Sequence, residues 1–147
     1  MLDALPGVTS DIPLMEETGT ATITLSTLEA EFPGIIAGID EPRVLLKSDT
    51  QGHDIEVLRG AGAQGLDPAI VAVLVELAPL PVYSGQPAMT AVMERIMADG
   101  FDAVAFEPLF ESSDGLRMVE LDALFMRSAD GRRDWGGNVK WRDPAQD

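Results

Sequence analysis

Apolar residues recur along this chain at two spacings, one typical of helices and one typical of strands. The clearest helical stripe lies in residues 88–99, where positions i, i+3, i+4, i+7 and i+8 are Met89, Val92, Met93, Ile96 and Met97. This spacing predicts an amphipathic helix that ends at Gly100. A methionine stripe serves either as a soft binding surface or as core, and the spacing favours core.

Strand patterns surround this helix. Residues 70–77 (IVAVLVEL) are almost continuously apolar and β-branched, which predicts a strand buried on both faces of a sheet. Shorter strands are expected at residues 44–48, 102–106 and 118–127, the last two joined across the turn-rich ESSDG. The alternation in TATITL predicts a half-exposed strand at residues 20–25.

Two shorter helices complete the pattern. Ser26 and Glu29 form a capping-box pattern, so a helix is expected to follow residue 26 and to end at Pro33-Gly34. A second helix is expected from His53 to Arg59, with Gly60 at its end.

The order of these elements predicts an α/β fold. Strands that alternate with helices imply a mostly parallel sheet, which here finishes in an antiparallel hairpin. We expect an irregular segment at residues 1–19, one domain at 20–127 and a polar tail at 128–147. Ligands of such sheets gather at the carboxyl ends of the strands, where the sequence places Asp49 and Glu76.

Asp49 directly follows the strand at residues 44–48, which leaves two interpretations open. Its carboxylate serves as a general base, a ligand of a substrate hydroxyl or one arm of a metal site. Alternatively, it caps the helix that begins near Gly52, where the helix dipole favours an acid. Asp54 lies in the first helical turn, so a helix-capping role is favoured for it over a role in catalysis or binding.

Other candidates lie near the same edge. His53, the only histidine, is able to accept a proton at neutral pH, although a lone histidine at a helix start is more often simply exposed. Glu76 ends the most buried strand, where an acid requires a partner or a ligand. Lys47 is a candidate partner, and Tyr83 either lines a pocket or covers the core.

The charge of the chain excludes several functions. The net charge is −15; the last twenty residues carry four acids and four bases, which leaves 21 acidic and 6 basic residues in 1–127. Such a body repels nucleic acid and anionic membranes. With no cysteine and one histidine, neither disulfides nor a zinc site of several histidines is possible.

Sequence motifs and topogenic signals give further limits. There is no glycine-rich dinucleotide loop, no Walker lysine and no nucleophile elbow. The N-terminus lacks a basic region followed by an apolar core, and the longest apolar run, residues 69–75, is too short to span a bilayer. We therefore expect a cytoplasmic protein.

Four ordered segments resemble the FkbM-type methyltransferases. LLKSDTQGHDIEVLRGA resembles the family signature, roughly LLKIDxEGxExxVLxG, and VLVELAPLPVYSG resembles the next strand with its acid and tyrosine-glycine loop. MADGF is similar to the turn into the sixth strand, and LDALFMR to the closing DALFVR strand. The resemblance covers residues 44–127.

The resemblance implies a Rossmann-like fold, S-adenosylmethionine as the cofactor and methylation of a hydroxyl on a sugar or secondary metabolite. It implies catalytic roles for Asp49, with His53 assisting, and substrate-binding roles for Lys47, Asp54, Glu76 and Tyr83. Ser48 replaces the usual isoleucine, and Asp54 is one methylene shorter than the usual glutamate.

The resemblance begins after the family's first strands, which hold the methyl donor. No donor-binding motif is therefore expected here, and no metal ligands are assigned. The chain matches the C-terminal part of the domain, either as a catalytic half or as a non-catalytic interaction module. A half sheet exposes an edge strand, which favours a homodimer or a partner chain.

Overall fold

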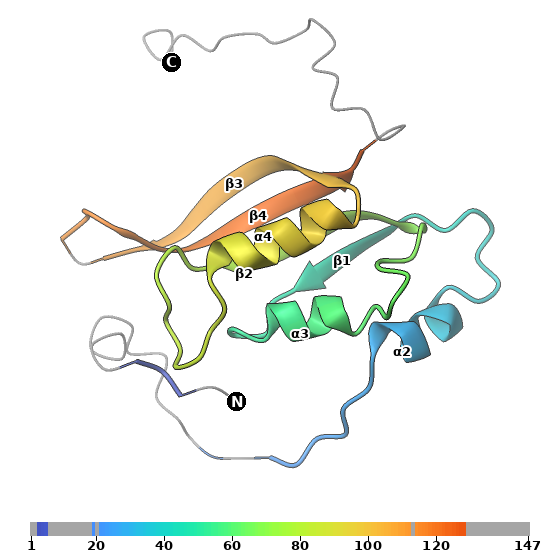
Figure 1. Ribbon diagram of the computed structural model, residues 1–147, viewed down its shortest axis with the longest axis horizontal. Coiled ribbons are helices and arrows are strands. Elements are labelled where there is room, and N and C mark those ends of the chain that lie inside the picture. Colours follow the sequence, from blue (N-terminus) through green and yellow to red (C-terminus); the bar gives the residue numbers. More distant parts are fainter. Residues whose placement is uncertain (1–2, 6–18, 20, 113, 129–147) are drawn as a thin grey trace, which may run out of the picture.

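Four strands form one open, mixed sheet in the computed structural model, which describes residues 3–5, 19, 21–112 and 114–128 (Figure 1). The strands are β1 (Val44–Ser48), β2 (Ile70–Leu77), β3 (Phe101–Glu111) and β4 (Met118–Arg127), in the order β1-β2-β4-β3. β1 and β2 are parallel, whereas β4 runs antiparallel to both β2 and β3. Three strands therefore share one direction, and the predicted α/β class with a terminal hairpin is confirmed.

Helices α3 (Asp54–Arg59) and α4 (Met89–Ala98) pack beside one another on one face of the sheet (Figure 1). The face beneath them consists of alternate residues of the central strands: Val73, Val75 and Leu77 of β2, and Leu121, Ala123 and Phe125 of β4. Ile96 and Leu58 are fully buried against this face. The methionine stripe of residues 88–99 packs against the same core, so its interpretation as core is confirmed.

The opposite face of the sheet is partly open. Leu45 of β1 pairs with Ala72 of β2, which pairs with Met126 of β4, so the three side chains lie in one row. Leu45 is 54% exposed and Met126 is 46% exposed. The prediction that β2 is buried on both faces therefore holds for the helix side only; on the other face Ala72, Leu74 and Glu76 are half-buried.

The predicted strand at residues 20–25 is wrong for the described residues 21–25, which form no strand. Ile23 is 73% exposed and Leu25 is 83% exposed. A strand requires a neighbouring ladder for its backbone groups, and among the described residues no strand lies beyond β1 or β3 in the sheet. The alternating sequence gives residues 21–25 a preference for an extended backbone, but it does not supply a neighbouring strand.

Helix α2 (Leu28–Ile35) begins and ends one or two residues later than the sequence predicted. Its N-cap is Thr27, whose Oγ1 accepts a hydrogen bond from Ala30 N, while Ser26 donates instead to Glu31. Pro33 lies in its last turn. Proline removes one amide donor there without blocking the residues that follow it, so the helix continues to Ile35.

Arg127, the last residue of β4, joins several segments at the amino end of β2. Its guanidinium lies 4.4 Å from the centre of the Phe101 ring. It also donates hydrogen bonds to four backbone carbonyl oxygens, those of Ile70, Leu66, Asp67 and Asp99. This side chain fixes the loop before β2 against the turn that follows α4.

Residues 3–5 are attached to the loop after β2. Ala4 forms an antiparallel bridge with Tyr83, Leu5 N donates to Val82 O (2.8 Å) and Ser84 N donates to Asp3 O (2.7 Å). The remainder of the predicted irregular segment, apart from residue 19, lies outside the described residues, as does the tail at 129–147. No helix in the described part of the chain is long and apolar enough to cross a membrane.

Candidate functional site

The carboxyl ends of β1 and β2 bring Asp49 and Glu76 into one hydrogen-bond network, and Gln51 joins them. Gln51 Nε2 lies 3.2 Å from Asp49 Oδ1 and 3.2 Å from Glu76 Oε1. An amide nitrogen has two hydrogens, so both are used in bridging the carboxylates. The predicted meeting of Asp49 and Glu76 at this edge is therefore observed, through a residue that the sequence interpretation left out.

The backbone at Gln51 is unusual. Its φ is +51°, in the left-handed region that side chains other than glycine rarely adopt, and Gly52 follows at +89°. This conformation turns the chain sharply between β1 and α3 and directs the Gln51 side chain toward Glu76. Residues held in this region at a conformational cost are concentrated at functional sites.

Tyr83 belongs both to the core and to the site. Its ring is buried with Ala78 and Val82, and its hydroxyl donates a hydrogen bond to Gln51 Oε1. Burial, followed by the negative charges of Glu120 and Glu76, raises the pKa of Tyr83 to about 12. The phenol therefore remains protonated near neutral pH and acts as a donor. Tyr83 thus covers part of the core, as one interpretation predicted, and it is not among the residues that line the two cavities of the described residues.

Glu76 is the carboxylate most altered by its surroundings. Burial is the main cause, and the charges of Glu120 and Asp49 add to it; together they raise the pKa of Glu76 to about 7. Glu120, which points to the same sheet face and is only 3% exposed, also has a raised pKa because of burial and Asp49. The site thus holds a carboxyl group that exchanges its proton near neutral pH.

Asp49 is shifted in the opposite direction. A hydrogen bond from Lys47 (Nζ to Oδ2, 3.2 Å) and then one from Gln51 lower the pKa of Asp49. Hydrogen bonding to Asp49 likewise raises the pKa of Lys47. Both side chains are largely exposed, so the ion pair adds little stability. Lys47 thus pairs with Asp49. The prediction that Lys47 pairs with Glu76 is wrong, because Gln51 is the residue that donates a hydrogen bond to Glu76.

Asp54 has a structural role in this arrangement. It is 5% exposed and accepts hydrogen bonds from Ser48 Oγ (2.5 Å) and Thr50 Oγ1 (3.0 Å). These contacts tie the end of β1 to the first turn of α3. Both donors are side-chain hydroxyls and not backbone amides of α3, so these bonds anchor the start of the helix to β1 without capping it. The substrate-binding role of Asp54 stays a prediction.

His53 is not brought into the network. It is the N-cap residue of α3, and its Nδ1 lies 3.9 Å from Glu56 Oε2, one turn along the helix. That ion pair is directed along α3, whereas Asp49 is bound by Lys47 and Gln51. Proximity in sequence therefore does not translate into a shared site for His53 and Asp49.

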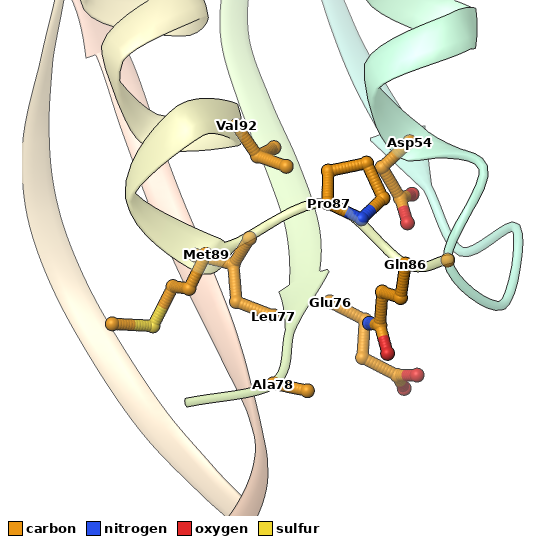
Figure 2. Close-up of a pocket in the computed structure, with 9 residues that line it drawn as sticks. Asp54, Glu76, Leu77, Ala78, Gln86, Pro87, Met89 and Val92 are labelled. Carbon is orange, nitrogen blue, oxygen red and sulfur yellow. The ribbon is translucent and has the colours of Figure 1, made fainter. Parts of the chain in front are cut away.

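A small cavity lies beside Glu76 (Figure 2). Its walls come from the start of α3, the end of β2 and the segment leading into α4, and they include Asp54, Glu76, Gln86 and Met89. Its volume is about 10 Å³, which is enough for about one water molecule. S-adenosylmethionine is far larger than this space, so this cavity does not hold that cofactor.

The larger cavity of the described residues lies elsewhere. It has a volume of about 250 Å³ and is lined by α2 and the loop before β2, including Phe32, Leu66 and Ile70. Ile70 is the first residue of β2, so this cavity lies at the amino end of the strand, opposite the predicted site. The carboxylate network and this cavity are therefore separate.

Three polar residues of the network were missed by the sequence analysis: Gln51, Glu120 and Asp122. Asp122 pairs with Glu76 across β2 and β4. The signal for the two acids is their alternation in MVELDALFMR, which places both on one sheet face. The signal for Gln51 is the family signature itself, which has glutamate at that position.

Within the described ranges, no group of three or more histidine, aspartate and glutamate side chains has an arrangement that could hold a metal ion. The Gln51 amide occupies the position between Asp49 and Glu76 that a cation would take. Comparisons with protein-family models, with curated proteins and with solved structures give no match. The class of protein defined here is thus an α/β domain with a half-buried carboxylate network at one sheet edge.

Proposed function

We propose that this chain forms the acceptor side of an FkbM-like, S-adenosylmethionine-dependent O-methyltransferase. The observation that carries the proposal is the Gln51 bridge between the ends of β1 and β2, because it joins the two acids of the matching segments in one network. The order of a parallel pair followed by an antiparallel hairpin also agrees with the C-terminal part of a Rossmann-like methyltransferase sheet.

In this proposal Glu76 replaces Asp49 as the proton acceptor. An efficient general base has a pKa near the working pH, and that of Glu76 is about 7, whereas that of Asp49 is lowered. A substrate hydroxyl bound at this edge gives its proton to Glu76, while Asp49 and Lys47 orient the hydroxyl group. Tyr83 holds Gln51 in place through its hydroxyl.

The direct test is binding of hydroxylated compounds to the chain, measured by ligand-observed NMR with a panel of sugars. We expect binding that Glu76→Ala and Asp49→Asn each weaken at least tenfold. Glu94→Gln, on the exposed side of α4, is the matched control and should bind as the wild type does. If no hydroxylated compound binds at millimolar concentration, the acceptor assignment is wrong.

A non-catalytic interaction module is the second candidate. The water-sized cavity beside Glu76 favours it, because that cavity has no space for a substrate or a methyl donor. Calorimetric titration with S-adenosylmethionine separates the cases further. Heat on titration would show that this chain binds the methyl donor, whereas no heat together with no sugar binding would favour the module.

A further inference from the structure

One edge strand of the sheet and one exposed segment have the character of β-strand partners and lack a neighbour. β1 is one of the two edge strands, with β3 at the other edge, so one side of β1 has no strand beside it among the described residues. Residues 21–25 alternate β-branched and apolar side chains yet form no strand, and Ile23 and Leu25 are 73% and 83% exposed. Unpaired strand edges and exposed alternating segments favour pairing with another chain.

The charge of the segment also suits pairing with β1. The segment lies in an uncharged stretch, residues 18–28, within a chain whose net charge is −15. It is therefore a part of this acidic molecule that can approach a second copy without adding like-charge repulsion.

Pairing within one chain is opposed by the way α2 is attached. Glu29 N, in the first turn of α2, donates a hydrogen bond to Gly60 O (2.9 Å) at the end of α3. This contact holds the end of the segment beside the far end of α3. In Figure 1 the segment leads from α2 past α3 and does not lie along β1.

We propose that residues 21–25 add to the free edge of β1 in a second copy of this chain, and that the second copy returns the same contact. The exchange is reciprocal, so it closes as a two-fold dimer and leaves neither segment unpaired. It adds one strand to each sheet and sets Ile23 and Leu25 beside Leu45, which is 54% exposed in the single chain. This inference does not depend on methyl transfer.

The test is sedimentation equilibrium at about 0.15 M salt, which screens the repulsion between acidic copies. We expect a dimer at about 100 µM that dissociates on dilution. Thr24→Pro removes a backbone donor from the segment and should weaken the dimer at least tenfold. Thr24→Val keeps the β-branched shape and is the matched control, which should dimerise as the wild type does.

Hydrogen exchange of the wild-type chain gives a second, mutation-free readout. The amides of residues 21–25 should be protected at least tenfold more at high than at low protein concentration. A wild-type chain that is monomeric at about 100 µM would overturn the proposal. So would a dimer that persists in Thr24→Pro, which would point to the β3 edge, or a dimer that Thr24→Val also abolishes.

Discussion

Gln51 and Glu76 are 25 residues apart in sequence, and Gln51 Nε2 lies 3.2 Å from Glu76 Oε1. This contact crosses from the turn after β1 to the end of β2, and it is made by a side chain whose own backbone is in the left-handed region. A neutral amide thus separates two carboxylates that would otherwise face each other. Because the Gln51 amide carries no charge, only Asp49 and Glu76 contribute charge at this contact.

Gln51→Glu should make the protein sensitive to pH. The new carboxylate would lie against Asp49 and Glu76, and removing both amide donors would leave these acids repelling it. We expect a loss of about 1–3 kcal/mol in the free energy of unfolding at pH 8, and a smaller loss at pH 5. Urea unfolding at the two pH values measures this.

Gln51→Met is the control for the charge. It removes the same hydrogen bonds without adding an acid, so its loss of stability should vary less between pH 5 and pH 8. Equal pH dependence in the two variants would show that charge repulsion does not govern the network.

Glu76 itself should limit stability at high pH. Its pKa is about 7 in the folded chain against 4.5 for an unperturbed glutamate side chain, so the folded state binds the proton more tightly than the unfolded state does. The stabilisation from the protonated form is complete below pH 4.5 and is lost as the pH rises to 7. Thermal unfolding of Glu76→Gln across this range should show a flatter profile than the wild type.

The control for this thermal-unfolding experiment is a substitution of an acidic residue outside the carboxylate network. Glu94→Gln changes an exposed residue of α4 and should leave the wild-type profile in place. A Glu76→Gln profile as steep as that of Glu94→Gln would assign the pH dependence to other groups, Glu120 among them.

Ser48 and Asp54 should show strong energetic coupling. Asp54→Ala removes the buried acceptor of two hydroxyl donors, and we expect it to lower the free energy of unfolding by about 2–3 kcal/mol. Ser48→Ala alone should cost about 1 kcal/mol. In a double-mutant cycle measured by urea unfolding, the double variant should lose less than the sum; simple additivity would contradict the contact.

Arg127→Lys should destabilise the fold although the charge is kept. Lysine lacks the planar fork that donates to four carbonyl oxygens and lies over Phe101. We expect a loss of about 2–4 kcal/mol, measured by urea unfolding. Arg117→Lys, at an exposed position in the β3–β4 turn, should change stability by less than about 0.5 kcal/mol.

The buried elements of this fold were predictable because burial imposes a strong pattern. β1, β2 and β4 have the bounds expected from the sequence, and α4 differs by one residue at each end. β3 extends five residues beyond residue 106 because its pairing with β4 continues into the hairpin, where its side chains are exposed. Because these residues are exposed, they show no hydrophobic alternation, and the sequence does not indicate where the strand ends.

The site was predictable in position but not in its contacts. Asp49 and Glu76 follow from the rule that strand ends meet at one edge. The bridge depends on the positive φ of Gln51, which nothing in the residue type indicates. His53 was assigned from its nearness in sequence to Asp49, and Lys47 from the expected adjacency of its strand to that of Glu76. The side chains contact Glu56 and Asp49 instead.

The attachment of residues 3–5 to residues 82–84 has a practical consequence for handling the protein. The three contacts hold the loop that presents the Tyr83 hydroxyl to Gln51. Removal of residues 3–5 by a protease would release that loop and through it alter the carboxylate edge. Preparations for ligand measurements should therefore keep residues 3–5 intact.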